Sequence, residues 1–345
     1  MLYINGRFLT QRITGVQRVG IELVKRMDKL VEPGQMAILT PPEIINHIEL
    51  KNIEIITIGK KSNNYWVQWV FPKYVKMHQG VSLTISGLAP FIAPYYFMAH
   101  DVTFMRHPES FSRKFKMMYD IGYKLTLNRC KHVFTVSEFS KREICCLYGV
   151  KENRISVVYN SSHQLIDENY DNVDVSKWGL KENDYYLSVS SKNAHKNQKY
   201  IMECAKQYPD KTFVIVGGNV PKSFNNVEFD KLNNVVFTGY VDTNELFSIY
   251  KSAKGFIFPS LYEGFGIPPL EAITLGVKQI AVSDIPVFRE VYPRGVYFFN
   301  PNNAKSFKME KMDNTIISED DFQFYWDTYS WDNGAKKIIS RIITK

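Results

Sequence analysis

Short apolar runs of strand length alternate with segments of helical periodicity along most of this chain. Runs such as Leu2–Asn5, Met36–Leu39 and His132–Val136 are each followed by segments whose apolar residues recur every three to four positions. This alternation predicts parallel sheets with helices on both faces. We therefore expect an α/β fold in which ligands bind beyond the carboxyl ends of the strands.

The alternation occurs twice. The stretch 161–184 is poor in apolar residues and rich in Asn, Asp and Glu, and the pattern restarts after it. With 345 residues, the chain is long enough for two domains that each bury a core. We predict two doubly wound, Rossmann-like domains at 1–165 and 185–325, which face each other across a cleft and are joined by a linker at 166–184.

Composition limits the class of protein and partner. A hydrophobic content of 45%, with 14% aromatic residues, excludes a disordered chain. The net charge of +8 favours anionic ligands such as nucleotides or lipid headgroups. The four cysteines show no Cys-x-x-Cys spacing, which fits a reducing compartment. The sequence starts without a basic leader followed by an apolar core, so we expect a cytoplasmic protein.

The segment 258–272 joins a predicted central strand to a helix and carries Glu263 and Glu271, with seven residues between them. Two glycines in the loop let the backbone approach a ligand closely, and two prolines suit the first turn of the helix. Free amides and the positive end of the helix dipole favour phosphate or sugar oxygens here. Taken alone, the same acids would also fit a capped helix whose carboxylate complements the dipole.

The complete stretch resembles the E-x7-E signature of retaining GT-B glycosyltransferases of family 4 (glycosyltransferase group 1). The resemblance implies that Glu263 contacts hydroxyls of the donor sugar and that Glu271 holds the nucleotide ribose. It also implies that the loop between them binds the donor sugar and diphosphate, largely through backbone amides: Gly264, Phe265, Gly266 and Ile267.

A cation beside the same ligand is expected after the first strand of the second domain. The resemblance matches Lys196 with the lysine that neutralises the donor diphosphate, which a metal-free transfer needs as charge develops on the leaving group. Family members often carry an Arg six residues upstream, where this chain has Ser190. Lys192 or His195 is then the candidate to compensate. Two glycines that end the next strand are expected near the base or phosphate: Gly217 and Gly218.

The first domain contains two further stretches that resemble the family. His100, in a His-Asp element, is implied to contact the donor sugar and to orient the reacting groups, with Asp101 beside it toward the acceptor. A glycine loop opens the first helix, where Gly15 is implied to approach the diphosphate and Arg18 the acceptor. Arg18 is equally well explained as a solvated charge on that helix. The C-terminal segment 326–345 is implied to be a helix that returns toward the first domain.

Motifs of several other enzyme classes are missing from the sequence. There is no Walker-type phosphate loop, no complete dinucleotide-binding fingerprint and no Asp-x-Asp of the metal-dependent transferases. The histidines and cysteines are too scattered to suggest zinc. We therefore expect neither a metal nor a cofactor.

Together these features predict a metal-independent, retaining hexosyltransferase. It would move a hexose or deoxyhexose from a nucleoside diphosphate sugar to a saccharide acceptor, carried on a lipid, in O-antigen (lipopolysaccharide) or capsule synthesis. The alternatives are a glycan- or nucleic-acid-binding protein that uses the same scaffold without turnover, and a nucleotide-sugar epimerase or phosphorylase. A binding protein gives no reason for the two acids, His100 and Lys196 to occur together, so nucleic acid is not an expected partner.

Two aromatic and basic segments, 65–76 and 113–118, offer material for docking on an anionic membrane surface. Sequences of similar appearance assemble polysaccharide repeat units on a lipid carrier at the inner face of the cytoplasmic membrane. A peripheral membrane location is one interpretation of these segments, and burial of their aromatic residues in the core is the other.

Overall fold

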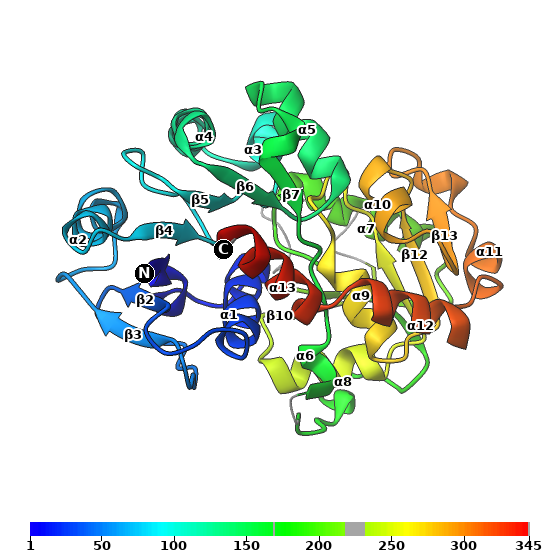
Figure 1. The fold of residues 1–345 in the computed structure, drawn as a ribbon. Helices are drawn as coiled ribbons and strands as arrows, with labels where there is room; N and C mark the ends of the chain where they lie inside the picture. The colour runs from blue at the N-terminus through cyan, green and yellow to red at the C-terminus, as the bar shows by residue number, and fades with distance from the viewer. Residues whose placement is uncertain (168–169, 218–231, 344–345) are drawn as a thin grey trace. The chain divides into compact units, whose positions relative to one another are not determined.

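The computed structural model describes residues 1–167, 170–217 and 232–343, and the chain divides into two compact units (Figure 1). Unit 1 contains Met1–Pro108, Ser112–Asn160 and the segment from Tyr329 onward. Unit 2 contains Glu109–Phe111 and Ser161–Thr328. The C-terminal segment is therefore part of the same unit as the amino terminus.

Unit 1 is built on a seven-stranded parallel sheet in the order β3-β2-β1-β4-β5-β6-β7. The strands are β1 (Leu2–Asn5), β2 (Met36–Thr40), β3 (Glu54–Thr57), β4 (Val81–Thr84), β5 (Tyr96–Met98), β6 (His132–Thr135) and β7 (Ile155–Val157). Strand β1 lies inside the sheet, where Leu2 is paired with Met36 of β2 on one side and with Val81 of β4 on the other. The strand order reverses between β1 and β4, which makes this the topological switch point of the sheet.

The segments 41–53 and 85–95 connect strands without a helix, and the other connections of unit 1 contain helices or helical turns. These helices and turns are η1 (Gly6–Thr10), α1 (Gly15–Asp28), the π-helical turn η2 (Trp66–Val70), α2 (Phe71–Met77), α3 (Thr103–Arg106), α4 (Arg113–Arg129), α5 (Glu138–Tyr148) and η4 (Glu152–Arg154). Ser137 caps α5 as predicted, since its hydroxyl accepts a hydrogen bond from the Ser140 amide at 2.9 Å. Pro72 lies in the first turn of α2, where a missing N–H costs little, so the aromatic segment stays helical.

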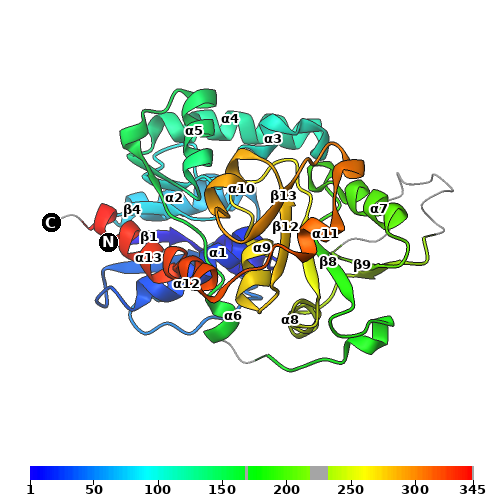
Figure 2. The same cartoon turned by 90° about the vertical axis from the view of Figure 1, so that its right-hand side faces the viewer.

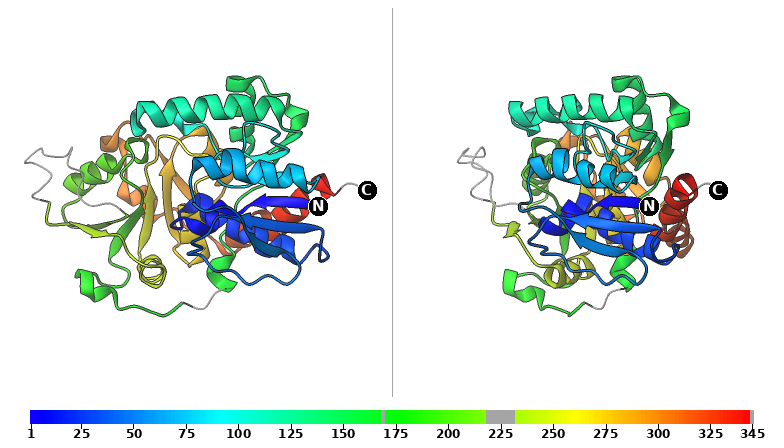
Figure 3. Two further views of the ribbon diagram at one scale, coloured as in Figure 1. Left: turned by 90° about the vertical axis from the view of Figure 1, so that its left-hand side faces the viewer. Right: turned by 60° about the vertical axis from the view of Figure 1, so that its left-hand side comes forward.

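The last helix, α13 (Trp331–Ile342), packs beside α1 within unit 1 (Figures 1 and 3). Trp331, Ala335 and Ile338 are buried on its inner face, as the helical spacing of apolar residues predicts. A β-carbon at Gly334 would lie 3.2 Å from Leu23 of α1, so glycine permits the close approach.

Unit 2 is built on a six-stranded parallel sheet in the order β10-β9-β8-β11-β12-β13. The strands are β8 (Tyr185–Val189), β9 (Thr212–Val216), β10 (Val235–Gly239), β11 (Gly255–Phe258), β12 (Gln279–Ser283) and β13 (Val296–Phe299). Strands β8 and β9 are paired along their whole length, from Tyr185–Thr212 to Val189–Val216 (Figure 2). Here the order reverses between β8 and β11.

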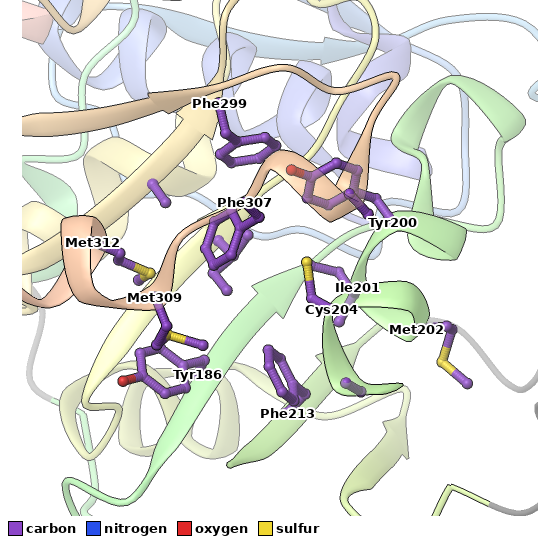
Figure 4. Close-up of a cluster of buried hydrophobic side chains, with 14 of the residues drawn as sticks. Tyr186, Tyr200, Ile201, Met202, Cys204, Phe213, Phe299, Phe307, Met309 and Met312 are labelled. Carbon is purple, nitrogen blue, oxygen red and sulfur yellow. The ribbon is translucent and has the colours of Figure 1, made fainter. Parts of the chain in front are cut away.

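Some helices of unit 2 pack on this sheet and others pack on those helices. The helices of this unit are α6 (Gln164–Asp167), η5 (Val175–Trp178), η6 (Ala194–Lys196), α7 (Gln198–Gln207), α8 (Thr243–Lys251), α9 (Ile267–Thr274), α10 (Pro286–Val291), η8 (Ala304–Ser306), α11 (Met309–Asp313) and α12 (Glu319–Thr328). Figure 4 shows part of the core, in which the Tyr200 and Phe299 rings stack at 4.7 Å. None of the helices in the described part of the chain combines the length and the apolar character needed to cross a bilayer.

Candidate functional site

The predicted donor-site residues of unit 2 follow three neighbouring strands. Ser190 comes directly after β8, Gly217 directly after β9, and the loop 259–266 directly after β11. The three strands are adjacent in the order β9-β8-β11, and their carboxyl ends lie at one edge because the sheet is parallel. The structure thus brings these residues to the switch point of the second sheet, where doubly wound folds bind ligands.

Lys196 and Glu263 form an ion pair across this switch point. The Lys196 ammonium nitrogen lies 2.6 Å from Glu263 Oε1, and the side chains are 20% and 13% exposed. The same ammonium lies 5.7 Å from the centre of the Phe258 ring. A cation held in this position keeps further N–H donors for an anionic ligand, because an ammonium group has three.

Hydrogen bonds to backbone carbonyls fix the two loops that carry this pair. The Leu261 amide donates to the His195 carbonyl at 2.7 Å. The side-chain amide of Asn197 donates to the carbonyls of Pro259 at 3.1 Å and Pro301 at 2.9 Å. Asn197 adopts a left-handed conformation with φ of 55°, which Asn tolerates better than most residues. The loops therefore hold Lys196 and Glu263 as one assembly.

The loop after β11 ends at Gly266, which has φ of 90° and precedes the first turn of α9. A β-carbon there would lie 2.6 Å from the Phe288 ring, so both conformation and space require glycine. The Phe265 side chain is only 2% exposed, and Gly264 is buried. The ring of Phe265 is part of the core, so this residue can offer a donor only its backbone. Ile267, half-buried, is the first residue of the helix.

Glu271 lies one turn into α9, where Tyr250 of α8 contacts it. The Tyr250 hydroxyl donates to Glu271 Oε2 at 3.0 Å. Burial, and secondarily the charge of Glu271, raises the pKa of Tyr250 well above its usual value, so the phenol stays a donor. Tyr250 was not predicted as a site residue, because it lies 21 positions before Glu271 in the sequence and its helical spacing indicates only a core position.

Ser190 and Gly217 are in contact at the ends of β8 and β9. A β-carbon on Gly217, which has φ of 94°, would lie 2.6 Å from the Ser190 carbonyl oxygen. The Ser190 hydroxyl accepts a hydrogen bond from Gln198 at 3.0 Å and is thus held in place. Gly218 lies outside the described residues.

The two residues suggested to compensate for Ser190 differ in their surroundings. Lys192 is exposed. His195 is 5% exposed, and its Nδ1 lies 2.9 Å from the Ser110 hydroxyl oxygen. Neither residue has a hydrogen bond or ion pair to Ser190 among the interactions given for the described residues, so compensation by Lys192 or His195 stays a prediction.

In unit 1, His100 follows β5 and is held by the main chain. Its Nε2 lies 2.7 Å from the Ile85 carbonyl oxygen, which can only accept, so Nε2 carries the proton. Burial lowers the pKa of His100, which keeps the ring neutral near pH 7. The lone pair of Nδ1 has no partner among the residues that the structure describes. A neutral imidazole of this kind can accept a hydrogen bond from a sugar hydroxyl.

The other predicted residues of unit 1 occupy helix starts. The Asp101 carboxylate accepts a hydrogen bond from the Thr103 amide at 2.7 Å, where α3 begins. Gly15 is the first residue of α1 and is exposed, while Arg18 lies on the next turn and is half-buried. These positions give Asp101 a structural role and leave the implied ligand contacts of the three residues as predictions.

Two family models match the chain. "Glycosyltransferase Family 4" matches residues 59–161 and "Glycosyl transferases group 1" matches residues 172–320. The chain is 33% identical over 313 residues to the O-antigen chain mannosyltransferase RfbU of Salmonella typhimurium, covering 88% of this chain and 84% of that protein.

Solved structures share the fold at low sequence identity. HepE of Anabaena, solved in complex with UDP and glucose, has a TM-score of 0.70 at 15% identity, covering all of this chain and 99% of that one. WaaG, a glycosyltransferase involved in lipopolysaccharide biosynthesis, has a TM-score of 0.68 at 15% identity and full coverage of both chains. The predicted GT-B class, with two parallel α/β sheets, is thereby confirmed.

Proposed function

Because the chain belongs to the group 1 glycosyltransferases, with a family 4 amino-terminal region, we propose that it transfers a hexose or deoxyhexose from a nucleoside diphosphate sugar to a saccharide of a bacterial surface polysaccharide. One observation carries the proposal: Lys196 and Glu263 meet at 2.6 Å at the switch point of the second sheet. The relative RfbU is named an O-antigen chain mannosyltransferase, and the fold neighbour HepE was solved with UDP and glucose.

In the proposed reaction the donor diphosphate lies beside Lys196 and the amides of Gly264 to Ile267. The bond from the anomeric carbon to the diphosphate oxygen breaks as the acceptor hydroxyl bonds to the same face of that carbon. The proton of the acceptor hydroxyl passes to the departing phosphate oxygen, and the configuration is retained. Lys196 and the amides stabilise the charge that grows on the diphosphate, so no metal ion is required.

The other side chains orient the donor. Glu263 accepts hydrogen bonds from the sugar hydroxyls and positions the Lys196 ammonium. Glu271, which Tyr250 holds at 3.0 Å, accepts from the ribose hydroxyls. His100 accepts from a sugar hydroxyl at its unprotonated Nδ1.

A panel of nucleoside diphosphate sugars tests the proposal by thermal shift, because a bound donor stabilises the folded state. We expect one base and one sugar to raise the melting temperature, and the same compound to be consumed when acceptor is added. Lys196→Met should strongly weaken both effects, whereas Lys199→Met, which changes an exposed lysine of α7, should keep them. Stabilisation without consumption of any donor would favour a binding protein instead.

We also propose that the acceptor is carried on a lipid and that unit 1 docks on an anionic membrane. An apolar groove of about 870 Å³ lies within unit 1, along η2, α2 and β4. Trp69 and Met77, at 57% and 69% exposed, line it, and Lys73 and Lys76 stand among the apolar residues. Exposed aromatic and aliphatic groups beside lysines suit acyl chains and phosphate headgroups.

The same segment also contributes to the core, so only its exposed residues are candidates for docking on a membrane. Trp66 and Phe71 are buried, whereas Tyr65 and Trp69 are exposed. Flotation with vesicles that contain phosphatidylglycerol tests the docking. Trp69→Ser and the Lys73→Glu, Lys76→Glu double variant should lose association, while Tyr240→Ser, an exposed aromatic of unit 2, should keep it. Equal flotation of all variants would refute this docking surface.

A further inference from the structure

A second, polar pocket lies entirely within unit 1, at the switch point of its sheet. It has a volume of about 340 Å³. Asn5 ends β1, and Ser86 and Gly87 follow β4, so the pocket lies between the two strands where the chain order reverses. Crevices at this point of a doubly wound sheet are where ligands bind. The remaining residues of its wall come from η1 and the loop after it, the start of α1, the region around the start of η2, the loop after β4, and α4.

Arg7 provides the only charge in the wall of this pocket, as far as the described residues show. Its Nη1 donates to the side-chain oxygen of Asn64 at 2.9 Å, but its buried Nε has no hydrogen-bond partner. No Asp or Glu is among the described residues that line the pocket. A partly desolvated guanidinium without a counterion is costly, and a carboxylate or phosphate from a ligand would compensate it.

Two neutral groups beside Arg7 are also left without partners. Asn5 is 1% exposed; its side-chain oxygen accepts from the Arg7 amide at 3.2 Å, which leaves its NH₂ group unsatisfied. Ser86 is 7% exposed and its hydroxyl has no partner among the described residues. Buried polar groups in folded proteins are normally hydrogen-bonded, so each exception requires an explanation. Here all three unsatisfied groups can donate hydrogen bonds.

The rest of the wall suits a sugar. Gln11 and Gln17 bond each other at 3.0 Å and present amide groups, while Phe115 and Tyr119 stack at 4.1 Å and present aromatic surface. Gly87, with φ of 76°, has open space where a side chain would project. Side-chain amides can donate hydrogen bonds to hydroxyl groups and accept hydrogen bonds from them, and aromatic rings can pack on the apolar faces of sugar rings.

We propose that this pocket holds a negatively charged group of the acceptor saccharide, a phosphate or a carboxylate, with Arg7 as its anchor and with Asn5 and Ser86 as further donors. The inference rests on the proposed glycosyl transfer for the identity of the ligand as an acceptor. It adds a requirement that the reaction does not impose: the acceptor carries a negative charge.

Binding of three simple sugars tests the proposal on the full chain. Glucose 1-phosphate, glucuronate and glucose are compared by ligand-observed NMR titration, with UDP or GDP present, whichever stabilises the protein, so that the donor site is filled. We expect one of the charged sugars to bind at least about tenfold more tightly than glucose, because charge-assisted hydrogen bonds are the strong ones. Whether glucose 1-phosphate or glucuronate binds more tightly shows whether the pocket prefers a phosphate or a carboxylate.

Variants test whether the charged sugar binds in this pocket. Arg7→Gln should remove the preference for the charged sugar, Arg7→Lys should restore part of it, and Ser86→Ala should weaken binding by a smaller factor. Arg113→Gln, which changes an exposed guanidinium of α4 outside the pocket, should bind like the wild type. The melting temperature with and without nucleotide shows whether each variant is folded.

Three results would overturn the inference. They are equal affinity for charged and neutral sugars in the wild type, an unchanged preference in Arg7→Gln, and a loss of nucleotide binding in Arg7→Gln with intact sugar binding, which would assign the pocket to the donor. Failure of the proposed function is a different result, since no nucleotide or nucleotide sugar would then stabilise even the wild type. The sugar titrations are in that case run without nucleotide.

Discussion

Lys196 Nζ lies 2.6 Å from Glu263 Oε1, although 67 residues separate the two in the sequence. Lys196 follows β8 and Glu263 follows β11, the two strands between which the order of the second sheet reverses. The two side chains are only 20% and 13% exposed, so water screens their attraction less than it would screen a surface ion pair. Removing either side chain leaves the charge of the other without its partner. The two side chains should therefore act as one unit.

Replacing Lys196 by Met or Glu263 by Gln should each lower kcat by about a hundredfold or more, on the order of 3 kcal/mol of transition-state stabilisation. In the double variant the loss should be smaller than the product of the single losses, because the partner is already missing. The measurement is a double-mutant cycle on sugar transfer. Lys177 and Glu245, an ion pair of the same unit with Lys177 44% exposed, are the matched control and should not affect transfer. Losses that simply multiply would show that the pair is not coupled.

Tyr250→Phe should weaken binding of the nucleoside diphosphate about fivefold, because it removes one hydrogen bond, of about 1 kcal/mol, that orients Glu271. Tyr186→Phe is the control: its hydroxyl donates to Asp313 Oδ1 at 2.7 Å, a bond to a different carboxylate of the same unit. Titration calorimetry should find weaker binding only in Tyr250→Phe. If both variants lose affinity equally, Tyr250 acts through general stability rather than through Glu271.

Gly217→Ala should destabilise the protein more than Gly276→Ala. Both glycines have positive φ, 94° and 87°, so alanine is strained at either position, at a cost of about 1 kcal/mol. At Gly217 a β-carbon would additionally lie 2.6 Å from the Ser190 carbonyl oxygen, whereas at Gly276 nothing lies within 4 Å. Thermal unfolding should give the lower melting temperature for Gly217→Ala, together with weaker nucleotide binding. Equal melting temperatures would mean that the β8 and β9 ends can move apart.

Stability should fall as the pH drops, in part because of His132. Burial, and then the charges of Arg341 and Arg154, lower the pKa of His132 from 6.5 to about 4. The neutral ring accepts from Arg341 at Nδ1, 3.3 Å, and its Nε2 lies 2.8 Å from the Ser156 hydroxyl. Below pH 6.5 the unfolded chain takes up the proton and the folded chain does not, so stability is lost as pH falls from about 6.5 toward 4.

Urea unfolding at pH 7 and pH 5 measures this effect. The wild type should lose about 2 kcal/mol more between these values than His132→Gln, as follows from the two pKa values. His47→Gln removes an exposed histidine and should behave like the wild type. An identical pH dependence in His132→Gln would contradict the assignment.

Much of the architecture could be predicted because its signals are local. Asp242 precedes α8 as predicted, and the structure adds a reciprocal capping box with Glu245. Trp331 begins α13 after the Ser330 cap. The periodicity of apolar residues predicted the alternation of strands and helices, because the apolar face of each element repeats every two to four residues along the chain. The aromatic segment 65–76 was less clear, because its spacing is helical whether a ring faces the core or the solvent.

The sequence by itself determined the α/β class and the family, because the 258–272 stretch combines two acids with glycines and prolines that have separate physical roles. Only the tertiary structure decided which side chains meet. The contact of Lys196 with Glu263, that of Tyr250 with Glu271, and the pocket around Arg7 all join residues on different elements. Such contacts depend on the order of the strands in the sheet. At a switch point, residues that are neighbours in space are distant in sequence, so local sequence patterns cannot predict their contacts.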